Sequence, residues 1–219
     1  MSTTPSGDRV NETASPRSEA KAVRRQALLD AAAGLFAAQG FAGVSLDDLG
    51  AAVGVSGPAI YRHFAGKQAV LGALLVGVSE ELLAGGRGAA GGETDDAEAS
   101  LRALVAFHVD FALAKPDVIR VQDRDFTSLS PDDQNAVRSL QLEYVDVWVQ
   151  TLRRLQPEAS QAELRLRAQA VFGLINSTPH SVGRARRDGG GRVPPTPARR
   201  LLESMALAAL TAPQLASPS

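Results

Sequence analysis

Cysteine is absent from the 219-residue sequence, which excludes disulfide bonds, thiolate metal sites and cysteine nucleophiles. The chain also lacks a Gly-x-Ser-x-Gly nucleophile elbow and a histidine-rich metal spacing. Its longer apolar stretches are interrupted by charges, and no apolar run follows the charges at the N-terminus, so we predict neither a membrane span nor a signal peptide. We therefore expect a cytoplasmic protein that is not an enzyme, with no catalytic residue, no metal and no cofactor.

An excess of charge of one sign is also missing. The 23 Lys and Arg residues nearly balance the 24 Asp and Glu residues, for a formal net charge of -1. This balance is unusual for a protein that binds nucleic acid, but the local distribution of charge matters more than the sum. Positive side chains are concentrated near the motif described next: Arg17, Lys21, Arg24, Arg25, Arg62 and Lys67.

The segment that begins at Ser45 has the pattern of two short helices joined by a tight turn. Ser45 is placed to cap the first helix, and Asp48, three residues later, completes a capping box. Gly54 permits the left-handed backbone that such a turn often requires. Ser56 is placed to cap the second helix, and Pro58 in its first turn loses no intrahelical hydrogen bond.

The inward positions of the same segment are apolar. Leu49 and Val53 form the buried stripe of the first helix, and Val55 is expected to pack under the turn. Ile60 and Phe64, four residues apart, anchor the second helix inward. Capping, turn and apolar spacing together predict a helix-turn-helix.

The outward positions of the second helix are polar. Tyr61, Arg62 and His63, with Lys67 at the start of the following helix, offer a hydroxyl, a guanidinium, an imidazole and an ammonium to one surface. Phosphate oxygens accept hydrogen bonds from all four groups. Any one of these residues alone fits an ordinary solvated helical corner, whereas the four together in this register favour a surface that binds DNA.

Three stretches of this region resemble the TetR family of bacterial repressors: residues 27–32, residues 36–41, and residues 55–64 followed by Lys67. The resemblance covers roughly residues 20–75. It implies a homodimer that binds double-stranded operator DNA, with the second short helix in the major groove. It also implies a larger helical domain that binds a small-molecule effector, which weakens operator binding.

The resemblance leads us to expect contacts with bases and phosphates at the motif, on a palindromic operator. Because Gly57 and Pro58 lack side-chain donors, they are limited to apolar contact, for instance with a thymine methyl, and Arg62 is the best candidate to read a guanine. Lys67→Ala is expected to weaken binding to all sequences evenly through the loss of a phosphate contact. The expected DNA-binding residues are Ser45, Ser56, Gly57, Pro58, Tyr61, Arg62, His63 and Lys67.

Helical patterns extend along the chain, so we expect an all-α fold with an N-terminal three-helix DNA-binding domain and a larger C-terminal helical domain for effector binding and dimerisation. The expected divisions are a disordered arm at 1–17, a helix-turn-helix domain at 18–66, and an effector-binding and dimerisation domain at 67–219. Outside the motif, helices are predicted at about 19–39, 67–86, 95–114, 117–126, 131–155, 159–184 and 197–210.

Residues 86–91 contain a literal Gly-x-Gly-x-x-Gly, a pattern that cradles a dinucleotide pyrophosphate in another context. A helix rather than a strand precedes it here, and no alternation of strands and helices surrounds it. We therefore reject a dinucleotide site and interpret residues 85–92 as a flexible linker.

The last two predicted helices are candidates for a dimer interface. The final helix presents Leu201, Leu202, Met205, Ala208 and Ala209, a face of mostly small residues that can pack closely. With the preceding helix it is expected to form a four-helix interface between two copies, as in the family.

Residues 131–155 are apolar on nearly every side, which predicts a central, buried helix.

Polar side chains on apolar stripes mark a possible effector site. Tyr144 and Trp148 lie one turn apart and suit the wall of a pocket for a largely apolar molecule, and His108, Asn176 and His180 interrupt apolar helix faces. Core packing is the alternative interpretation for Tyr144 and Trp148, and a core histidine that makes one hydrogen bond is the alternative for His108. The two arginines of the predicted helix at 117–126, Arg120 and Arg124, either pair with Asp117 or Asp123 or face an anionic effector. The expected ligand-binding residues are His108, Arg120, Arg124, Tyr144, Trp148, Asn176 and His180.

Residues 172–181, with Tyr144 and Trp148 upstream, also resemble a subgroup of TetR-like regulators that sense acyl-CoA thioesters of lipid or steroid breakdown. This implies an elongated pocket for the acyl chain, with Arg120 or Arg124 or the basic loop 183–197 near the CoA phosphates. Two alternatives stay open: a regulator of an efflux or antibiotic gene that senses a drug-like molecule, and an architectural DNA-binding protein.

Overall fold

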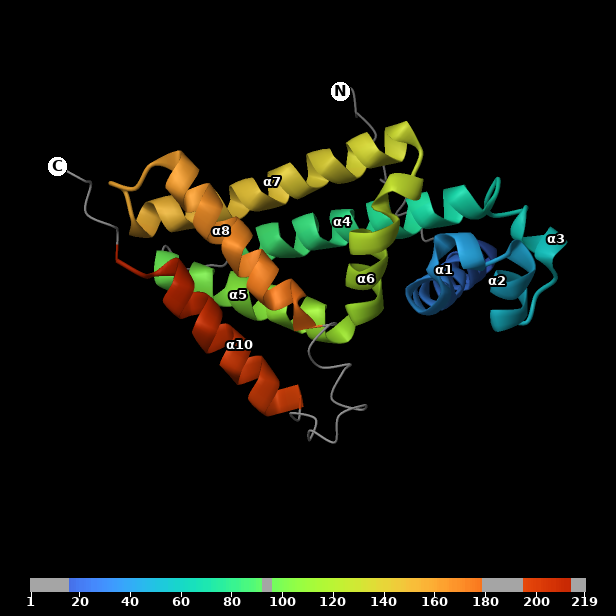
Figure 1. The fold of residues 1–219 in the computed structure, drawn as a ribbon, viewed down its shortest axis with the longest axis horizontal. Helices are drawn as coiled ribbons and strands as arrows, with labels where there is room; N and C mark the ends of the chain where they lie inside the picture. Colours follow the sequence, from blue (N-terminus) through green and yellow to red (C-terminus); the bar gives the residue numbers. More distant parts are fainter. Residues whose placement is uncertain (1–15, 92–95, 179–194, 214–219) are drawn as a thin grey trace, which may run out of the picture.

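The computed structural model describes residues 16–91, 96–178 and 195–213, and all regular elements in these ranges are helices (Figure 1). The predicted all-α fold class is confirmed. The helices are α1 (Pro16–Gly43), α2 (Leu46–Ala52), α3 (Gly57–Ile60), α4 (Lys67–Ala90), α5 (Ala97–Ala114), α6 (Pro116–Asp125), the 3-10 turn η1 (Phe126–Ser128), α7 (Pro131–Leu155), α8 (Gln161–Asn176) and α10 (Pro195–Leu210).

The helices form two groups joined by α4. Helices α1, α2 and α3 lie together at one end of the molecule, and α4 runs from them into the C-terminal helices, with α7 alongside it (Figure 1). Helix α5 packs against α4 and α7, while α8 and α10 pack on one another at the far end. Helix α6 stands between α5 and α7 in the chain and packs against α1, so two elements of the C-terminal group touch the N-terminal one.

Side-chain caps fix where three of the C-terminal helices begin. Each cap accepts a hydrogen bond from a main-chain N–H of the first turn, which otherwise has no intrahelical partner. Asp96 caps α5 by accepting from Glu98 and Ala99, Ser130 caps α7 by accepting from Asp133, and Ser160 caps α8 by accepting from Glu163.

The predicted stop at Gly40 is confirmed, although the chain continues as a further turn to Gly43. Gly40 has φ 82° and ψ 155°, a left-handed φ that L side chains rarely adopt, and it interrupts the helical geometry of α1. This break separates the long body of α1 from its last turn.

The interpretation of residues 85–92 as a flexible linker is wrong for residues 85–90, because α4 continues to Ala90. Glycine is needed there for close packing rather than for freedom of the backbone. A Cβ at Gly85 would collide with the Phe107 ring, and a Cβ at Gly86 would collide with the Tyr144 ring. The glycines therefore let α5 and α7 approach α4 closely.

Within the described residues, α4 is the one helix long and apolar enough to cross a membrane by length and composition. Half of its most apolar window is buried inside the protein. Val70, Leu71, Leu74, Leu75 and Val78 supply much of this buried face. These are properties of a core helix that holds the surrounding helices together.

Helix α7 is not buried on all sides, contrary to the prediction. Tyr144, Val145, Trp148 and Val149 face the core, whereas Leu142 is 53% exposed. Most other exposed residues of α7 are polar, so the helix is amphipathic. Among the predicted features, residues 1–15 of the arm, His180, and residues 183–194 of the basic loop lie outside the described ranges.

Candidate functional site

The first helix of the predicted helix-turn-helix is capped as expected. The Ser45 hydroxyl accepts from the Asp48 N–H at 3.1 Å, and the Asp48 carboxylate accepts from the Ser45 N–H at 2.8 Å. Hydrogen bonds from the Ser45 side chain and main chain lower the pKa of Asp48. The Ser45 hydroxyl also donates to Asp48 at 2.6 Å, so this side chain is engaged in the cap.

The turn between α2 and α3 depends on Gly54, whose φ is 70°. The Val55 N–H donates to the Gly50 carbonyl at 2.9 Å and closes the turn. The prediction that Val55 packs under the turn is wrong, because this side chain is exposed. The left-handed backbone at Gly54 thus allows the tight turn between α2 and α3.

Helix α3 is shorter than the sequence suggested. Regular helix ends at Ile60, and the chain continues as turns in which the N–H groups of His63 and Phe64 both donate to the Ile60 carbonyl. Ser56 makes no side-chain capping hydrogen bond, so its predicted role as a cap is wrong. Ile60 and Phe64 are buried, as expected from their spacing.

The outer face of α3 and its following turn is exposed. Tyr61 is 61% exposed, and Pro58, Arg62 and the Ser56 residue are also exposed. His63 is half-buried, and its Nδ1 has no hydrogen-bond partner within the described ranges. This surface combines one guanidinium and two hydroxyl groups with apolar area, a set that suits contact with both bases and phosphates.

Lys67 is directed inward rather than toward this face. Its ammonium donates to the main-chain carbonyls of Phe41 at 2.8 Å, Val44 at 2.7 Å and Ala42 at 3.4 Å, and it lies 4.6 Å from the centre of the Phe41 ring. An ammonium has three N–H donors, and these contacts occupy them. The structure therefore gives Lys67 a fastening role between α4 and the end of α1, in place of the expected phosphate contact.

We expect Lys67→Ala to lower the free energy of unfolding by about 2 kcal/mol, because three carbonyls at a helix end lose a charged donor. Urea unfolding followed by circular dichroism measures this loss. Lys21→Ala, on the exposed side of α1, is the control and should change the stability by less than about 0.5 kcal/mol. If Lys67→Ala leaves the stability unchanged but reduces the salt dependence of operator binding, Lys67 contacts a phosphate instead.

A cavity of about 480 Å³ lies among the C-terminal helices, within the range of known small-molecule sites. Three of the predicted ligand-binding residues, His108, Tyr144 and Asn176, line it. The remaining wall is mainly apolar, with Arg138 as the lining cation. The other lining residues are Ser79 and Leu82 from α4, Leu140, Gln141, Leu142 and Val145 from α7, and Gln169 and Phe172 from α8.

The polar wall of this cavity is a hydrogen-bonded chain. His108 Nε2 lies 3.2 Å from Asn176 Oδ1, and His108 Nδ1 lies 3.0 Å from the Tyr144 hydroxyl. Because an amide oxygen can only accept, His108 donates from Nε2, and its Nδ1 accepts from Tyr144. Burial lowers the pKa of His108 to about 4, against a smaller opposing effect of Asn176, so the imidazole is neutral. Burial likewise raises the pKa of Tyr144.

Trp148 stands behind this wall rather than in it. It is fully buried and makes edge contacts with the rings of His108, Tyr144 and Phe172, at centroid distances of 6.0, 6.2 and 5.1 Å. The sequence contains no other tryptophan, so its fluorescence reports on the cavity wall alone.

The two arginines predicted to meet an effector do not line this cavity. Arg120 pairs with Asp117 at 2.8 Å within α6. Arg124 pairs with Asp125 and donates to main-chain carbonyls of α1. Arg138 was not predicted as a lining residue. The signal that could have identified it is its place on α7, seven residues before Val145 on the same helix face.

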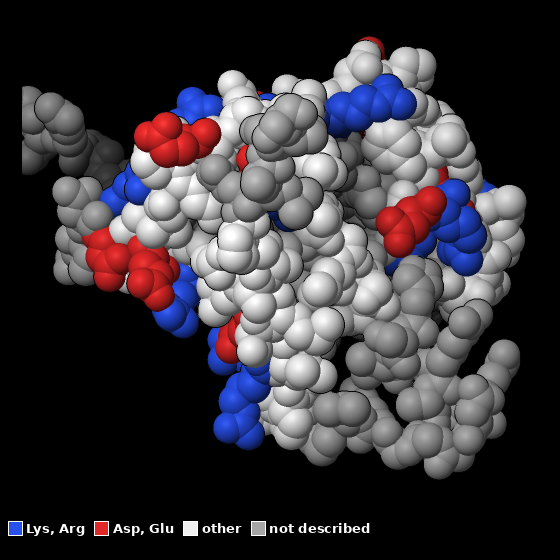
Figure 2. Space-filling model, turned by 60° about the vertical axis from the view of Figure 1, so that its left-hand side comes forward, with Lys and Arg blue, Asp and Glu red and all other residues white. Residues whose placement is uncertain are grey.

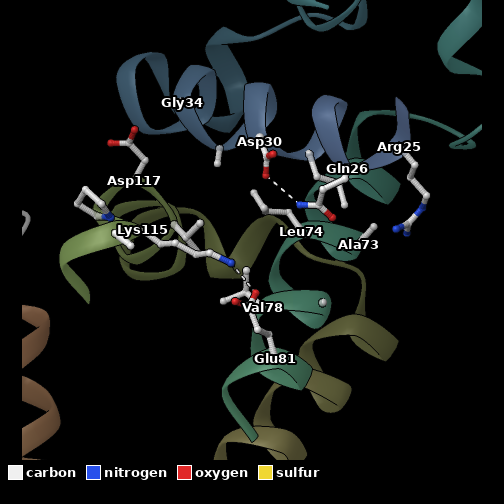
Figure 3. Close-up of a pocket in the computed structure, with 16 residues that line it drawn as sticks. Arg25, Gln26, Asp30, Gly34, Ala73, Leu74, Val78, Glu81, Lys115 and Asp117 are labelled. Atoms are coloured by element: carbon white, nitrogen blue, oxygen red, sulfur yellow. Dashed lines mark hydrogen bonds and ion pairs between the residues drawn. The ribbon is translucent and has the colours of Figure 1, made fainter. Parts of the chain in front are cut away.

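A second cavity, of about 380 Å³, separates the N-terminal and C-terminal groups (Figure 3). Charged side chains from α1, α4 and the corner between α5 and α6 surround it. Asp30 accepts from Gln26 at 2.9 Å, and Lys115 pairs with Glu81. Its polar rim distinguishes this second cavity from the mainly apolar first cavity, which Arg138 lines.

An apolar surface covers one side of α8 and α10. Leu166 is 66% exposed, Leu201 57% and Met205 46%, and Gly173 lies on the same exposed side. Figure 2 brings this side of the molecule forward and shows a broad area without charged side chains. An exposed apolar area of this kind commonly marks a protein interface. No cluster of three metal-ligating side chains occurs within the described ranges.

Comparison with known proteins agrees with both groups of helices. Residues 28–74 match the family model described as bacterial regulatory proteins, tetR family, and residues 94–180 match the tetracyclin repressor-like C-terminal domain. The chain is 26% identical over 194 residues to the HTH-type transcriptional repressor KstR2 of Rhodococcus jostii. The aligned region covers 88% of this chain and 94% of KstR2.

Two solved structures illustrate the similarity of the fold. A TetR-family transcriptional regulator from Bordetella parapertussis has a TM-score of 0.71 at 24% identity, over 85% of this chain and 94% of its own. The regulator FadR from Bacillus subtilis, solved in complex with stearoyl-CoA, has a TM-score of 0.65 at 16% identity, over 86% of this chain and 99% of its own.

Proposed function

Because this chain belongs to the TetR family of bacterial regulatory proteins, we propose that it is a dimeric repressor that leaves a palindromic operator when a hydrophobic effector binds. The chain is a TetR-type transcriptional repressor with a helix-turn-helix that binds DNA. Proteins of this family are DNA-binding regulators rather than enzymes. The observation that carries the effector part of the proposal is the apolar cavity with its polar wall and a single lining arginine.

The DNA-binding part of the proposal rests on the exposed face of α3. Arg62 and Tyr61 project from the turn after α3, while Pro58 offers apolar surface at its start. We assign base reading to Arg62 and contacts with phosphate to Tyr61 and to Ser56, whose hydroxyl is not used as a cap. His63 is assigned a contact with the DNA backbone, and Gly57 allows close approach of the main chain. This role implies that the protein is located in the cytoplasm, at the nucleoid.

Arg62→Ala should cost about 1 to 3 kcal/mol of operator affinity and relax specificity at one base position. The measurement is the dissociation constant for a selected operator and for each of its single base-pair variants. Wild-type protein should discriminate strongly at one guanine, and Arg62→Ala should lose that discrimination only. An equal loss on every sequence would place Arg62 on phosphate.

We propose an acyl-CoA thioester as the effector, with its acyl chain in the cavity. The wall of Leu140, Val145 and Phe172 suits the acyl chain, and the Asn176 amide can donate to a carbonyl oxygen. Arg138, exposed at the cavity, replaces Arg120 and Arg124 as the contact for a CoA phosphate. The stearoyl-CoA bound by the B. subtilis regulator of the same fold supports this class of ligand.

Stearoyl-CoA is expected to change the fluorescence of Trp148 with a saturable dependence on concentration, because the cavity wall packs on the indole. Arg138→Ala should weaken this binding roughly three- to tenfold by the loss of a charged phosphate contact. Arg153→Ala, on the exposed side of α7 and away from the cavity, is the matched control and should bind as the wild type does. A response to drug-like aromatic molecules and to no thioester would favour the regulator of an efflux or antibiotic gene.

A further inference from the structure

The break in α1 at Gly40 is held by two cations from the C-terminal helices. Lys67 donates to the carbonyls of Phe41 and Val44, which follow the break. Arg124, at the end of α6, takes carbonyls before the break: its Nη2 donates to Phe36 and its Nη1 lies 3.4 Å from the carbonyl of Ala37. Carbonyls at a helix end lack partners within the helix, and a guanidinium satisfies them well.

A buried carboxylate orients Arg124 for this contact. Asp125, the last residue of α6, is buried and accepts from Arg124 Nε at 3.2 Å and from Nη2 at 3.0 Å. A buried carboxylate requires such partners, since an unpaired charge in the interior is costly. The guanidinium therefore has one edge fixed to α6 and the other on α1.

The residue after this pair leads to the effector cavity. Phe126 follows Asp125 directly, and the Arg138 guanidinium lies 5.1 Å from the centre of its ring. Arg138 lines the cavity. The cavity is thus linked to the break in α1 in three steps: Arg138 contacts Phe126, the main chain joins Phe126 through Asp125 to Arg124, and Arg124 contacts α1.

We propose that Arg124 is a positioning residue for operator binding, and that Arg138, Phe126 and Arg124 form a relay that transmits the occupancy of the cavity to α1. An anion on Arg138 draws the guanidinium away from the Phe126 ring. The adjacent Arg124–Asp125 pair then shifts, and the body of α1 loses its attachment to α6. The orientation of α2 and α3 relative to the C-terminal helices changes with α1. This relay rests on the proposed function for its ligand.

The test measures operator affinity of the full-length protein with and without saturating stearoyl-CoA, with ligand binding followed separately by Trp148 fluorescence. In the wild type, the ligand should weaken operator binding about tenfold or more. In Arg124→Gln and in Phe126→Ala the ligand should bind within about twofold of wild type, yet weaken operator binding by less than about threefold. The double variant should behave like either single one, because both lie on one path. Arg124→Lys, which keeps the charge without the fork, should fall between.

Arg102→Gln is the matched control, since Arg102 also pairs with a neighbouring carboxylate, Glu98, but on the exposed side of α5. It should leave both operator affinity and the effect of the ligand unchanged. Wild-type coupling in Arg124→Gln overturns the relay, and so does a further loss of coupling in the double variant.

A readout without any ligand separates this proposal from the choice of effector. Hydrogen exchange of the main-chain amides of residues 36–44 should become about tenfold faster in Arg124→Gln, as expected for the loss of one charged hydrogen-bonding group. Operator affinity without ligand should fall with it. If stearoyl-CoA leaves Trp148 unchanged, the acyl-CoA assignment fails while this exchange still tests Arg124; unchanged exchange overturns the positioning role.

Discussion

Leu166→Glu combined with Met205→Glu is expected to convert the proposed dimer into a monomer and to weaken operator binding at least about a thousandfold. Both side chains are large, apolar and exposed, and they lie on the two helices, α8 and α10, that we propose to meet their copies across a two-fold axis. In the dimer, the substitutions would bring four carboxylates into one apolar interface. Burial of unpaired charge costs several kcal/mol, more than such an interface tolerates.

Loss of the dimer removes DNA affinity because a monomer contacts a single half-site of a palindrome. Sedimentation velocity gives the oligomeric state, and fluorescence anisotropy with a labelled operator gives the affinity. Val23→Glu is the control for oligomeric state, since Val23 is 69% exposed on α1, and it should stay dimeric. A double variant that remains a dimer at the same concentration would show that α8 and α10 do not form the interface.

Stability should fall by about 3 kcal/mol between pH 7 and pH 4 through His108 alone. Burial lowers the pKa of this imidazole to about 4 in the folded protein, whereas an unfolded histidine titrates near 6.5. Below pH 6.5 the unfolded chain therefore binds a proton that the folded protein does not bind. The stabilising contribution is complete above pH 6.5 and is lost as the pH falls toward 4.

Urea unfolding at several pH values between 7 and 4.5 measures this dependence. His108→Gln is the control, because it keeps a polar side chain without a titrating imidazole, and both proteins share the same carboxylates, His63 and His180. The variant is expected to be less stable at pH 7 but to lose less stability on acidification. Parallel pH profiles for the two proteins would contradict a buried, neutral His108.

Local features of the helix-turn-helix could be predicted from the sequence because their partners are close in the chain. The Ser45–Asp48 capping box and the left-handed Gly54 each depend on a few neighbouring residues. The same reasoning failed for Ser56, whose hydroxyl makes no cap, and for Val55, which is exposed. Spacing shows which donors are available, but not which of them the packed structure uses.

The roles of the long cations could not be predicted, since they depend on contacts between distant segments. Lys67 reaches carbonyls 23 to 26 residues earlier in the chain, and Arg124 reaches carbonyls 87 and 88 residues earlier. The sequence suggests a DNA contact for Lys67 and, for Arg124, either a nearby aspartate or an anionic effector. Spacing along the chain does not reveal the distant carbonyls that these side chains contact. The tertiary fold supplies that partner by breaking α1 at Gly40.

The residues of the proposed effector cavity could be predicted only in part. His108, Tyr144 and Asn176 were recognised as polar groups on apolar helix faces, and they meet at the cavity wall. Trp148 was placed in the wall but packs behind it. Gly85 and Gly86 looked like a linker, because the Phe107 and Tyr144 rings that require them are distant in sequence.

The central claim is that one molecule in this cavity releases the operator. The most direct measurement titrates stearoyl-CoA into the wild-type complex with a labelled operator and records DNA anisotropy and Trp148 fluorescence in the same sample, with CoA alone as the control. We predict that both signals change over the same range of concentration and that CoA alone changes neither. A full change in Trp148 fluorescence with the operator still bound, or release of the operator with Trp148 unchanged, would contradict the account.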